Sequence, residues 1–433
     1  MAGARQVHDD RRHGERRALK PRAPSNPMRE RPTLLIAALG VAQIVSWGTL
    51  YYSFSLFVLP MQQTLGWSLT ALNGALTSGL LVAGLCALPV GSFIDRHGGR
   101  GLMTAGALGA VVLIGAWSQV ETLVAFYAVW IGLGACMSAV LYEPLFVVLT
   151  YHFKSDARRA ITTLTLVAGF ASTVFMPLIE TLLGLLPWRD VLLVLALIYA
   201  VITVPVHALL IPTRSPDDVV QTSATGAPAR GAARVYLRAR LRDPAFWGLT
   251  IWFTAYSGTA SGLMFQLVPY LKAGDIPVAT ILVTVALVGP SQVAGRLLLM
   301  LAGDRASTTV VGAFTTTLTP LAVLVLILAP PTTAMLALFA VMFGVANGVT
   351  TILRGVAPAE WLGRAHYGSV MGAIGAPMMI AAALAPLATA AIWSASGNAR
   401  AMQWAVLTVA LTGAIGFWTA VATRGSAGHS TSI

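Results

Sequence analysis

Residues 69–92 read LTALNGALTSGLLVAGLCALPVGS, and the next eight residues, 93–100, read FIDRHGGR. The first stretch carries no charge and is long enough for one bilayer crossing, which takes about 20 mostly apolar residues in a helix. The second stretch changes at once to charged residues and glycine. Together they predict a membrane-spanning helix that ends in a short polar turn.

The composition of the whole chain repeats this pattern. Of 433 residues, 56% are hydrophobic and only 10% are charged, against roughly 25% charged in an average soluble domain. This excludes a soluble enzyme, a disordered protein and a disulfide scaffold, and the two cysteines support no Cys-based metal site. A β-barrel is disfavoured because its spans alternate apolar and polar residues. Every crossing is therefore expected to be helical, since lipid leaves no partner for open backbone groups.

Twelve apolar runs are predicted as membrane spans, and they define the expected organisation of the chain. The runs cover residues 33–60, 69–92, 101–119, 122–150, 160–184, 189–211, 245–271, 277–302, 308–329, 333–355, 366–392 and 401–422. The expected fold is an all-α membrane protein of two pseudo-symmetric six-helix bundles. Its expected parts are a basic cytoplasmic tail (1–32), an N-terminal bundle (33–212), a cytoplasmic linker (213–244), a C-terminal bundle (245–422) and a cytoplasmic C-terminal tail (423–433).

The basic residues are predicted to lie almost entirely on one side of the membrane. With the N-terminus inside, 24 of the 28 Lys and Arg fall on the inner side, and only Arg189, Lys272 and Arg400 fall outside. This positive-inside asymmetry predicts that both termini are cytoplasmic, in a bacterial plasma membrane. The net charge of +12 therefore reflects topology, and no nucleic-acid partner is expected.

The linker and a repeated turn support the division into halves. Residues 233–242, ARVYLRARLR, predict either a basic amphipathic helix at the membrane surface or a solvated loop. Residues 300–305, MLAGDR, follow span eight and place Asp304 and Arg305 at the turn equivalent to Asp95 and Arg96. Repeated halves that rock about a central site are typical of many secondary transporters.

The turn after span two resembles the major facilitator superfamily motif of the form G-x-L-a-D-R-x-G-R-K. Its matching residues are Gly91, Asp95, Arg96, Gly98 and Arg100, whereas Phe93 and Gly99 depart from the pattern. The second copy is degenerate because Met300 replaces the leading glycine. In the superfamily, this motif is implied to stabilise the state that is closed toward the cytoplasm.

Elementary physics gives the motif residues similar roles. Gly91 allows two helices to approach closely, and Asp95 can lie at the N-terminus of another helix, where backbone N–H groups favour an anion. Arg96 and Arg100 are expected to bind carbonyls or acidic groups of the other half. The alternative is that this segment is only a topogenic basic loop.

Three further stretches resemble the bacterial monocarboxylate and oxalate:formate branch of that superfamily. They are residues 46–68 (SWGTLYYSFSLFVLPMQQTLGWS), 168–178 (AGFASTVFMPL) and 295–305 (GRLLLMLAGDR). The branch is implied to bind the substrate carboxylate with an arginine of span eight, and Arg296 matches that place. Arg296 is thus a candidate substrate anchor through a two-pronged contact; alternatively, it pairs with Glu143 or caps backbone carbonyls.

Two other ionisable residues, Glu143 in span four and Arg354 in span ten, are expected inside the membrane. A charge at the bilayer centre costs about 3 kcal/mol on insertion scales, so each needs a partner or a wet cavity. We hypothesise that the two residues pair and close the inner gate; alternatively, Arg354 extends to lipid headgroups. Glu143 is also the candidate for proton coupling, because a carboxyl that alternates between burial and an arginine partner can take up and release a proton.

Polar and aromatic residues of span one form a second group of candidates. Gln43, Trp47 and Tyr51 are spaced i, i+4, i+8, which places them on one helical face. That face either lines the substrate cavity or packs against other helices. Asn73 and Gln292 are weaker candidates for substrate contact.

The sequence therefore predicts a secondary active transporter for a small organic anion such as a monocarboxylate, working by alternating access and coupled to protons. No catalysis and no cofactor are implied, and no ATP-binding G-x-x-x-x-G-K-[ST] loop is present. The alternative is an efflux pump for drugs or toxic compounds, including metalloids. A non-transporting membrane sensor is a more remote alternative. A monomer in the lipid bilayer is expected.

Overall fold

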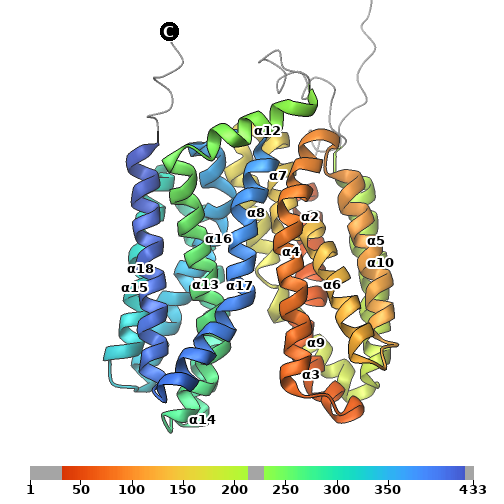
Figure 1. The fold of residues 1–433 in the computed structure, drawn as a ribbon, viewed down its shortest axis with the longest axis vertical. Helices are drawn as coiled ribbons and strands as arrows, with labels where there is room; N and C mark the ends of the chain where they lie inside the picture. Colours follow the sequence, from red (N-terminus) through yellow and green to blue (C-terminus); the bar gives the residue numbers. More distant parts are fainter. Residues whose placement is uncertain (1–31, 213–228, 425–433) are drawn as a thin grey trace, which may run out of the picture.

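The computed structural model describes residues 32–212 and 229–424, and every regular element in these ranges is a helix (Figure 1). The first group of helices is built by α2 (Pro32–Trp47), η1 (Gly48–Tyr52), α3 (Ser53–Leu65), α4 (Leu69–His97), α5 (Arg100–Trp117), α6 (Leu123–Val140), α7 (Tyr142–Phe153), η2 (Lys154–Asp156), α8 (Ala157–Ala168), α9 (Ala171–Leu185), α10 (Trp188–Pro205) and η3 (Val206–Leu210).

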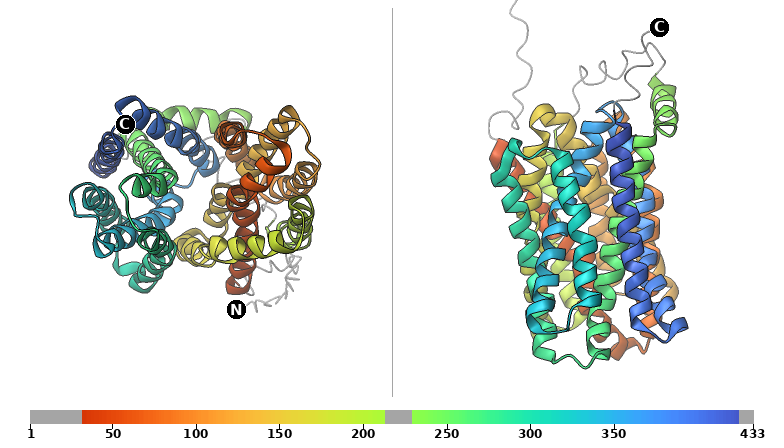
Figure 2. Two further views of the ribbon diagram at one scale, coloured as in Figure 1. Left: turned by 90° about the horizontal axis from the view of Figure 1, so that it is seen from below. Right: turned by 90° about the vertical axis from the view of Figure 1, so that its left-hand side faces the viewer.

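The second group follows a helix that lies across one end of the molecule, α12 (Ala229–Arg240). It is built by α13 (Pro244–Ala273), α14 (Val278–Ala302), η4 (Gly303–Arg305), α15 (Thr308–Leu328), α16 (Thr333–Trp361), α17 (Tyr367–Ser396) and α18 (Ala399–Thr423). The two groups stand side by side with their long helices roughly parallel (Figure 2). We call the end that carries α12 the linker end, and the opposite end the far end.

The number of apolar helices differs from the number of spans predicted. Ten helical segments of the described chain are long and apolar enough to cross a membrane. One of them, Leu123–Leu185, supplies two passes, because the chain turns back at the linker end between α7 and α8. The helix α13 packs beside α17 and α18 but is not among the ten. Its Trp, Tyr, Ser, Gly and Gln residues make it less apolar than its neighbours.

Polar residues at the turns fix where several helices begin. A side-chain oxygen at each of these positions accepts a hydrogen bond from a backbone N–H in the first turn of the following helix, which satisfies a donor that the helix leaves open. The capping residues are Ser68, Thr122, Asp243, Ser307, Thr332 and Asn398. The breaks that the sequence shows between apolar runs therefore act as helix starts.

The apolar cores show where the two groups are joined. One cluster at the linker end mixes both groups, with Phe146 and Ile161 packed in the same core as Leu353 and Val370. Toward the far end, each group has its own cluster; Ala383 of α17 alone joins the cluster of the first group. The groups are thus packed together at the linker end and largely separate at the far end.

Candidate functional site

A break in the fourth pass brings Glu143 to a helix N-terminus in the interior of the molecule. The backbone at Leu141 is extended, so the predicted single span divides into α6 and α7, and Glu143 lies in the first turn of α7. Breaking the helix frees the carbonyl oxygen of Val140, which accepts a 2.7 Å hydrogen bond from Gln43 Nε2. Gln43 is fully buried, so this predicted substrate-binding residue stabilises the helix break in this conformation.

A π-helical turn reshapes the face of the first pass. The π-helix spans Gly48–Tyr52, and such turns are rare and often mark functional sites. Gly48 lies directly against Phe175, because a Cβ on Gly48 would come within 2.1 Å of that ring. The wider turn brings Tyr52, five residues after Trp47, to the same face as Tyr51. The α-helical spacing in the sequence predicted Gln43, Trp47 and Tyr51 on this face, without Tyr52.

Four rings gather at this point and form what we call the aromatic cluster: Trp47, Tyr51, Tyr52 and Tyr142. The Trp47 ring centroid lies 5.4 Å from that of Tyr51, 6.4 Å from that of Tyr52 and 5.1 Å from that of Tyr142. Tyr142 belongs to α7, next to Glu143 in the chain. The cluster therefore connects the first pass to the broken helix.

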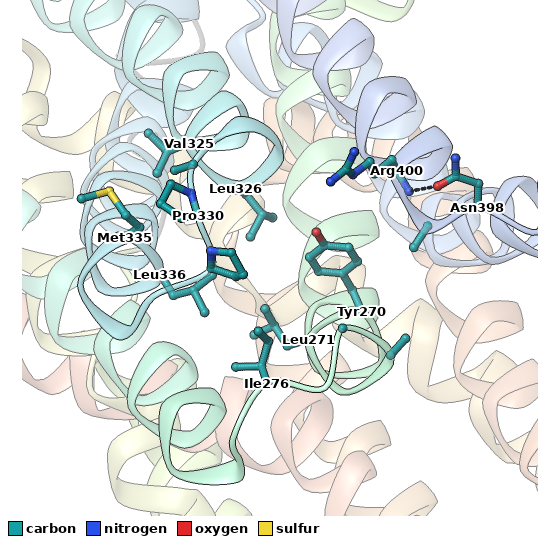
Figure 3. A pocket seen from close by; sticks show the side chains of 15 residues that line it. Tyr270, Leu271, Ile276, Val325, Leu326, Pro330, Met335, Leu336, Asn398 and Arg400 are labelled. Carbon is teal, nitrogen blue, oxygen red and sulfur yellow. Dashed lines mark hydrogen bonds between the residues drawn. The ribbon is translucent and has the colours of Figure 1, made fainter.

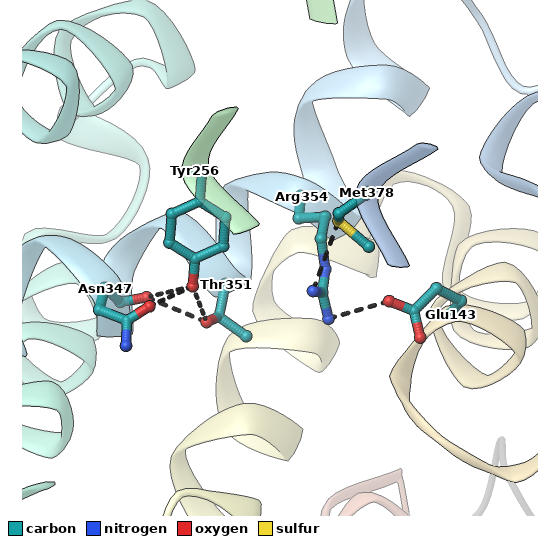
Figure 4. A network of polar contacts seen from close by, with 6 residues as sticks. All are labelled: Glu143, Tyr256, Asn347, Thr351, Arg354 and Met378. Carbon is teal, nitrogen blue, oxygen red and sulfur yellow. Dashed lines mark hydrogen bonds and ion pairs between the residues drawn. The ribbon is translucent and has the colours of Figure 1, made fainter. Parts of the chain in front are cut away.

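Arg354 of the second group reaches this cluster and the acidic residue beside it. Its Nη2 atom lies 3.1 Å from Glu143 Oε1, and its guanidinium carbon lies 5.9 Å from the ring centroid of Tyr142 (Figure 4). Arg354 Nη1 also donates to Met378 Sδ at 3.7 Å. Among the described residues, Glu143 Oε1 accepts no hydrogen bond of normal geometry, so the link is a charge contact. The predicted pair is present in this conformation, and its gating role stays a prediction.

Arg296 lies between the groups without a carboxylate. It is only 5% exposed, and it donates from Nε to Gly348 O at 3.2 Å and from Nη1 to Thr165 O of the first group at 2.9 Å. Its Nη1 also lies directly against Gly169, because a Cβ on Gly169 would come within 2.3 Å of this Nη1 atom. Arg296 forms no ion pair within the described residues, and Glu143 pairs with Arg354 instead. The sequence left three roles open for Arg296: a substrate anchor, a partner of Glu143, or a donor to backbone carbonyls. The structure shows the third, with Gly348 O and Thr165 O as acceptors.

A polar network on the second group adjoins the arginines and was not predicted from the sequence. The Tyr256 hydroxyl donates to Asn347 Oδ1 and contacts the Thr351 hydroxyl at 3.1 Å (Figure 4). Thr351 precedes Arg354 by three residues and shares its helical face. The sequence signal was present, since Tyr256 and Asn347 place strongly polar groups inside otherwise apolar spans.

The remaining substrate-binding candidates lie in two different places. Gln292 precedes Arg296 by four residues on α14, so it shares the face of that arginine; it is half-buried. Asn73 lies exposed near the far end of α4, and its side chain donates to Leu69 O in its own helix at 2.8 Å. Asn73 is therefore not part of the arginine and aromatic arrangement.

The motif after the second pass joins the two groups through Asp95. Its carboxylate accepts hydrogen bonds from Gly368 N at 2.8 Å, Ser369 N at 2.7 Å, Ser369 Oγ at 2.6 Å and Tyr151 OH at 2.6 Å. Gly368 and Ser369 form the first turn of α17, as expected for an anion at a helix N-terminus. Gly91 permits this approach, because a Cβ there would come within 1.9 Å of Gly368 O.

The motif arginines do not make the cross-group contacts expected of them. Arg100 Nη2 donates to Leu209 O at 2.7 Å, within its own group, because Gly98 ends α4 with a φ of +80° and α5 then runs beside α10. Arg96 is exposed and makes no polar contact within the described residues. In this structure Arg158 makes such a contact, donating to Ala306 O of the second group at 2.6 Å.

The degenerate second copy of the motif contributes little to the structure described. Arg305 is exposed at the end of the 3₁₀ turn η4. The Asp304 side chain lies outside the described residues. Within the described residues no three His, Cys, Asp or Glu side chains are placed to hold a metal ion.

A pocket of about 290 Å³ lies elsewhere, at the far end of the second group (Figure 3). Tyr270, Leu326, Leu336 and Arg400 are among the residues that line it. It contains none of the predicted substrate-binding residues. The pocket is therefore separate from Glu143, Arg296 and Arg354, which lie where the two groups meet.

Comparison with known proteins agrees with this architecture. A family model described as Major Facilitator Superfamily matches residues 39–299. Similar solved structures include the transporter FucP in the outward conformation, with a TM-score of 0.68 and 15% identity over 90% of this chain and 98% of that chain. A structure of the E. coli fucose:proton symporter FucP gives a TM-score of 0.68 and 16% identity, again over 90% of this chain and 98% of that chain.

The human organic anion transporter MFSD10 (TETRAN) is also similar, with a TM-score of 0.66 and 14% identity over 92% of this chain and all of that chain. At these identities the likeness shows a common fold. No curated protein sequence matches the chain significantly. Because the family model spans more than half of its length, the chain belongs to the Major Facilitator Superfamily.

Proposed function

We propose that this secondary transporter carries a small organic monoanion between its two helix groups, by alternating access and with proton coupling. The observation that carries the substrate class is the state of Arg296, a buried guanidinium with no carboxylate partner among the described residues. A charge inside a membrane protein is costly unless it is compensated. Two backbone carbonyls satisfy Nε and Nη1 and leave Nη2 available to a carboxylate on the substrate.

The balance of charges indicates how many negative charges the substrate carries. Arg296 and Arg354 supply two positive charges between the groups, and Glu143 supplies one negative charge. One positive charge thus stays uncompensated, and a single carboxylate on the substrate would neutralise it. This supports a monocarboxylate over a dianion, and it disfavours the cationic compounds that many drug exporters carry.

Glu143 is the proposed proton carrier. Its cationic partner among the described residues, Arg354, is 3.1 Å away and belongs to the other group, so movement of the groups would separate the two. A buried carboxylate that loses its cation is expected to take up a proton. Proton uptake would therefore follow the opening of the linker end, and release would follow its closure.

The contacts at the linker end support alternating access. Asp95 at the start of α17, Glu143 with Arg354, and Arg158 with Ala306 all join the groups near that end. We propose that the linker end is cytoplasmic, as the distribution of basic residues predicts, and that the membrane is a bacterial plasma membrane. The described conformation would then be closed toward the cytoplasm.

Uptake into proteoliposomes tests this function. We expect saturable flux of monocarboxylates whose rate changes when a transmembrane proton gradient is imposed, and no flux of lipophilic cations. Saturable flux of the cations without flux of carboxylates would replace this proposal with the exporter alternative. Carboxylate flux that ignores the proton gradient would remove the coupling and keep the substrate class.

A further inference from the structure

Trp47 holds an unused hydrogen-bond donor in the aromatic cluster. Its indole Nε1 is buried and has no acceptor within the described residues. Leaving a buried donor unpaired is unfavourable, so such groups call for an explanation. The Trp47 ring is held by Tyr51, Tyr52 and Tyr142, which restricts the directions in which this donor can point.

A second unused donor lies near Tyr142. Arg354 Nε is also buried and without an acceptor among the described residues, and the guanidinium carbon is 5.9 Å from the Tyr142 ring centroid. Trp47 comes from the first helix group and Arg354 from the second. Two open donors from opposite groups therefore lie near the same ring.

The local backbone keeps Trp47 at this position. Trp47 is the residue directly before the π-helix Gly48–Tyr52, and Gly48 packs against the ring of Phe175. The π-turn is an uncommon conformation, and proteins retain such turns frequently at functional sites. The indole is therefore placed by the turn and by its ring neighbours together, which is what precise recognition of a small molecule requires.

We propose that Trp47 Nε1 donates a hydrogen bond to a second, neutral oxygen of the substrate and thereby determines specificity. The preferred substrate is then a small monoanion that carries a neutral acceptor oxygen besides its carboxylate. This assignment rests on the proposed function, which supplies the carboxylate and its arginine. A plain hydrocarbon acid of the same length would leave the indole N–H unpaired and bind less tightly.

The test compares matched pairs of acids in proteoliposomes containing the full chain. Each pair consists of an oxo, hydroxy or ether monocarboxylic acid and the hydrocarbon acid of the same length. The measured quantity is the ratio of their KM values. The variant Trp47→Phe keeps an aromatic ring and removes the N–H, so we expect the preference for the oxygen-bearing acid, measured as the ratio of the two KM values, to fall about three- to tenfold.

Trp130→Phe is the matched control. Trp130 Nε1 is also buried and has no acceptor in the part of the chain that the structure describes, but this indole packs in the apolar core of the first helix group, against Phe54 and Trp117. The same chemical change there is expected to leave the KM ratio as it is in the unmodified protein. A fall of the ratio in both variants would show a general effect of losing an indole and would overturn the assignment.

The remaining outcomes separate this assignment from the proposed function. An unmodified protein that moves both acids equally well, or a Trp47→Phe variant with an unchanged ratio, overturns the role of Trp47 alone. In that case the edge-on contact with Tyr51, at an interplanar angle of 73°, would accommodate the N–H. An unmodified protein that moves neither acid overturns the proposed function and the assignment with it.

Discussion

Replacing Asp95 by Asn should open the linker end of the protein. In the structure the Asp95 carboxylate accepts four hydrogen bonds, two of them from backbone N–H groups in the first turn of α17. An amide has one acceptor oxygen and no charge, so the variant loses the charge-assisted part of these bonds and the favourable interaction with the helix dipole. A hydrogen bond to a charged group contributes about 1.5–3 kcal/mol, and a charge at a helix terminus about 0.3–2 kcal/mol.

We take a loss of about 3 kcal/mol for this variant, since Asn keeps part of the bonding. This corresponds to a shift of roughly 100-fold in the equilibrium toward the state that is open at the linker end. The matched control is Ser369→Ala, which removes one hydroxyl donor and leaves the charge. It should cost about 1 kcal/mol and shift the equilibrium roughly fivefold.

Cysteine accessibility measures this shift. Ser92 is a suitable labelling position, because its hydroxyl lies 3.2 Å from that of Ser369 across the two groups. In a background that lacks Cys86 and Cys136, a Ser92→Cys probe should react faster with a polar thiol reagent when Asp95 is Asn. Equal labelling rates with Asp95 and with Asn would refute the view that this carboxylate holds the linker end closed.

Two further sets of variants test the Glu143–Arg354 pair and the π-turn. Reversing the charge of Glu143 or of Arg354 alone should abolish transport. The double variant Glu143→Arg with Arg354→Glu should restore part of it, because Glu143 Oε1 and Arg354 Nη2 lie 3.1 Å apart and the exchanged charges can pair again. A double variant as inactive as the single variants argues against the pairing. Gly48→Ala should lower the melting temperature, because its Cβ would overlap the Phe175 ring and overpacking costs about 1–3 kcal/mol. Gly115→Ala, where a Cβ meets nothing within 4 Å, is the matched control, and equal melting temperatures for the two variants would contradict the packing seen at Gly48.

Apolarity and spacing were sufficient to predict the all-helical membrane fold, since each pass must satisfy its own backbone in lipid. The position of Asp95 at a helix N-terminus followed from the motif and from general electrostatics. The partner of Arg100 could not be predicted from the motif. A long arginine side chain can reach several carbonyls, and only the packing of α5 beside α10 selects Leu209.

The details of the candidate site depend on tertiary structure in the same way. The π-turn at Gly48–Tyr52 accompanies the close approach of Phe175 from another helix, and a period of 3.6 residues cannot reveal it. The break at Leu141 likewise needs Gln43 to bind the freed carbonyl of Val140. As a result, the predicted face of span one contained Gln43 but lacked Tyr52. The contact of this face with Tyr142 of α7 was not predicted either.

Equilibrium binding of a monocarboxylate to the purified protein tests the central claim, that the buried charge of Arg296 holds the anion. Arg158→Lys is the matched control, because Arg158 also donates to a carbonyl of the opposite group but lies at the linker end. Loss of binding in Arg296→Gln, and at least a tenfold weaker Kd in Arg296→Lys with the control unchanged, is the predicted result. A Kd in Arg296→Lys equal to that of the unmodified protein would contradict the claim.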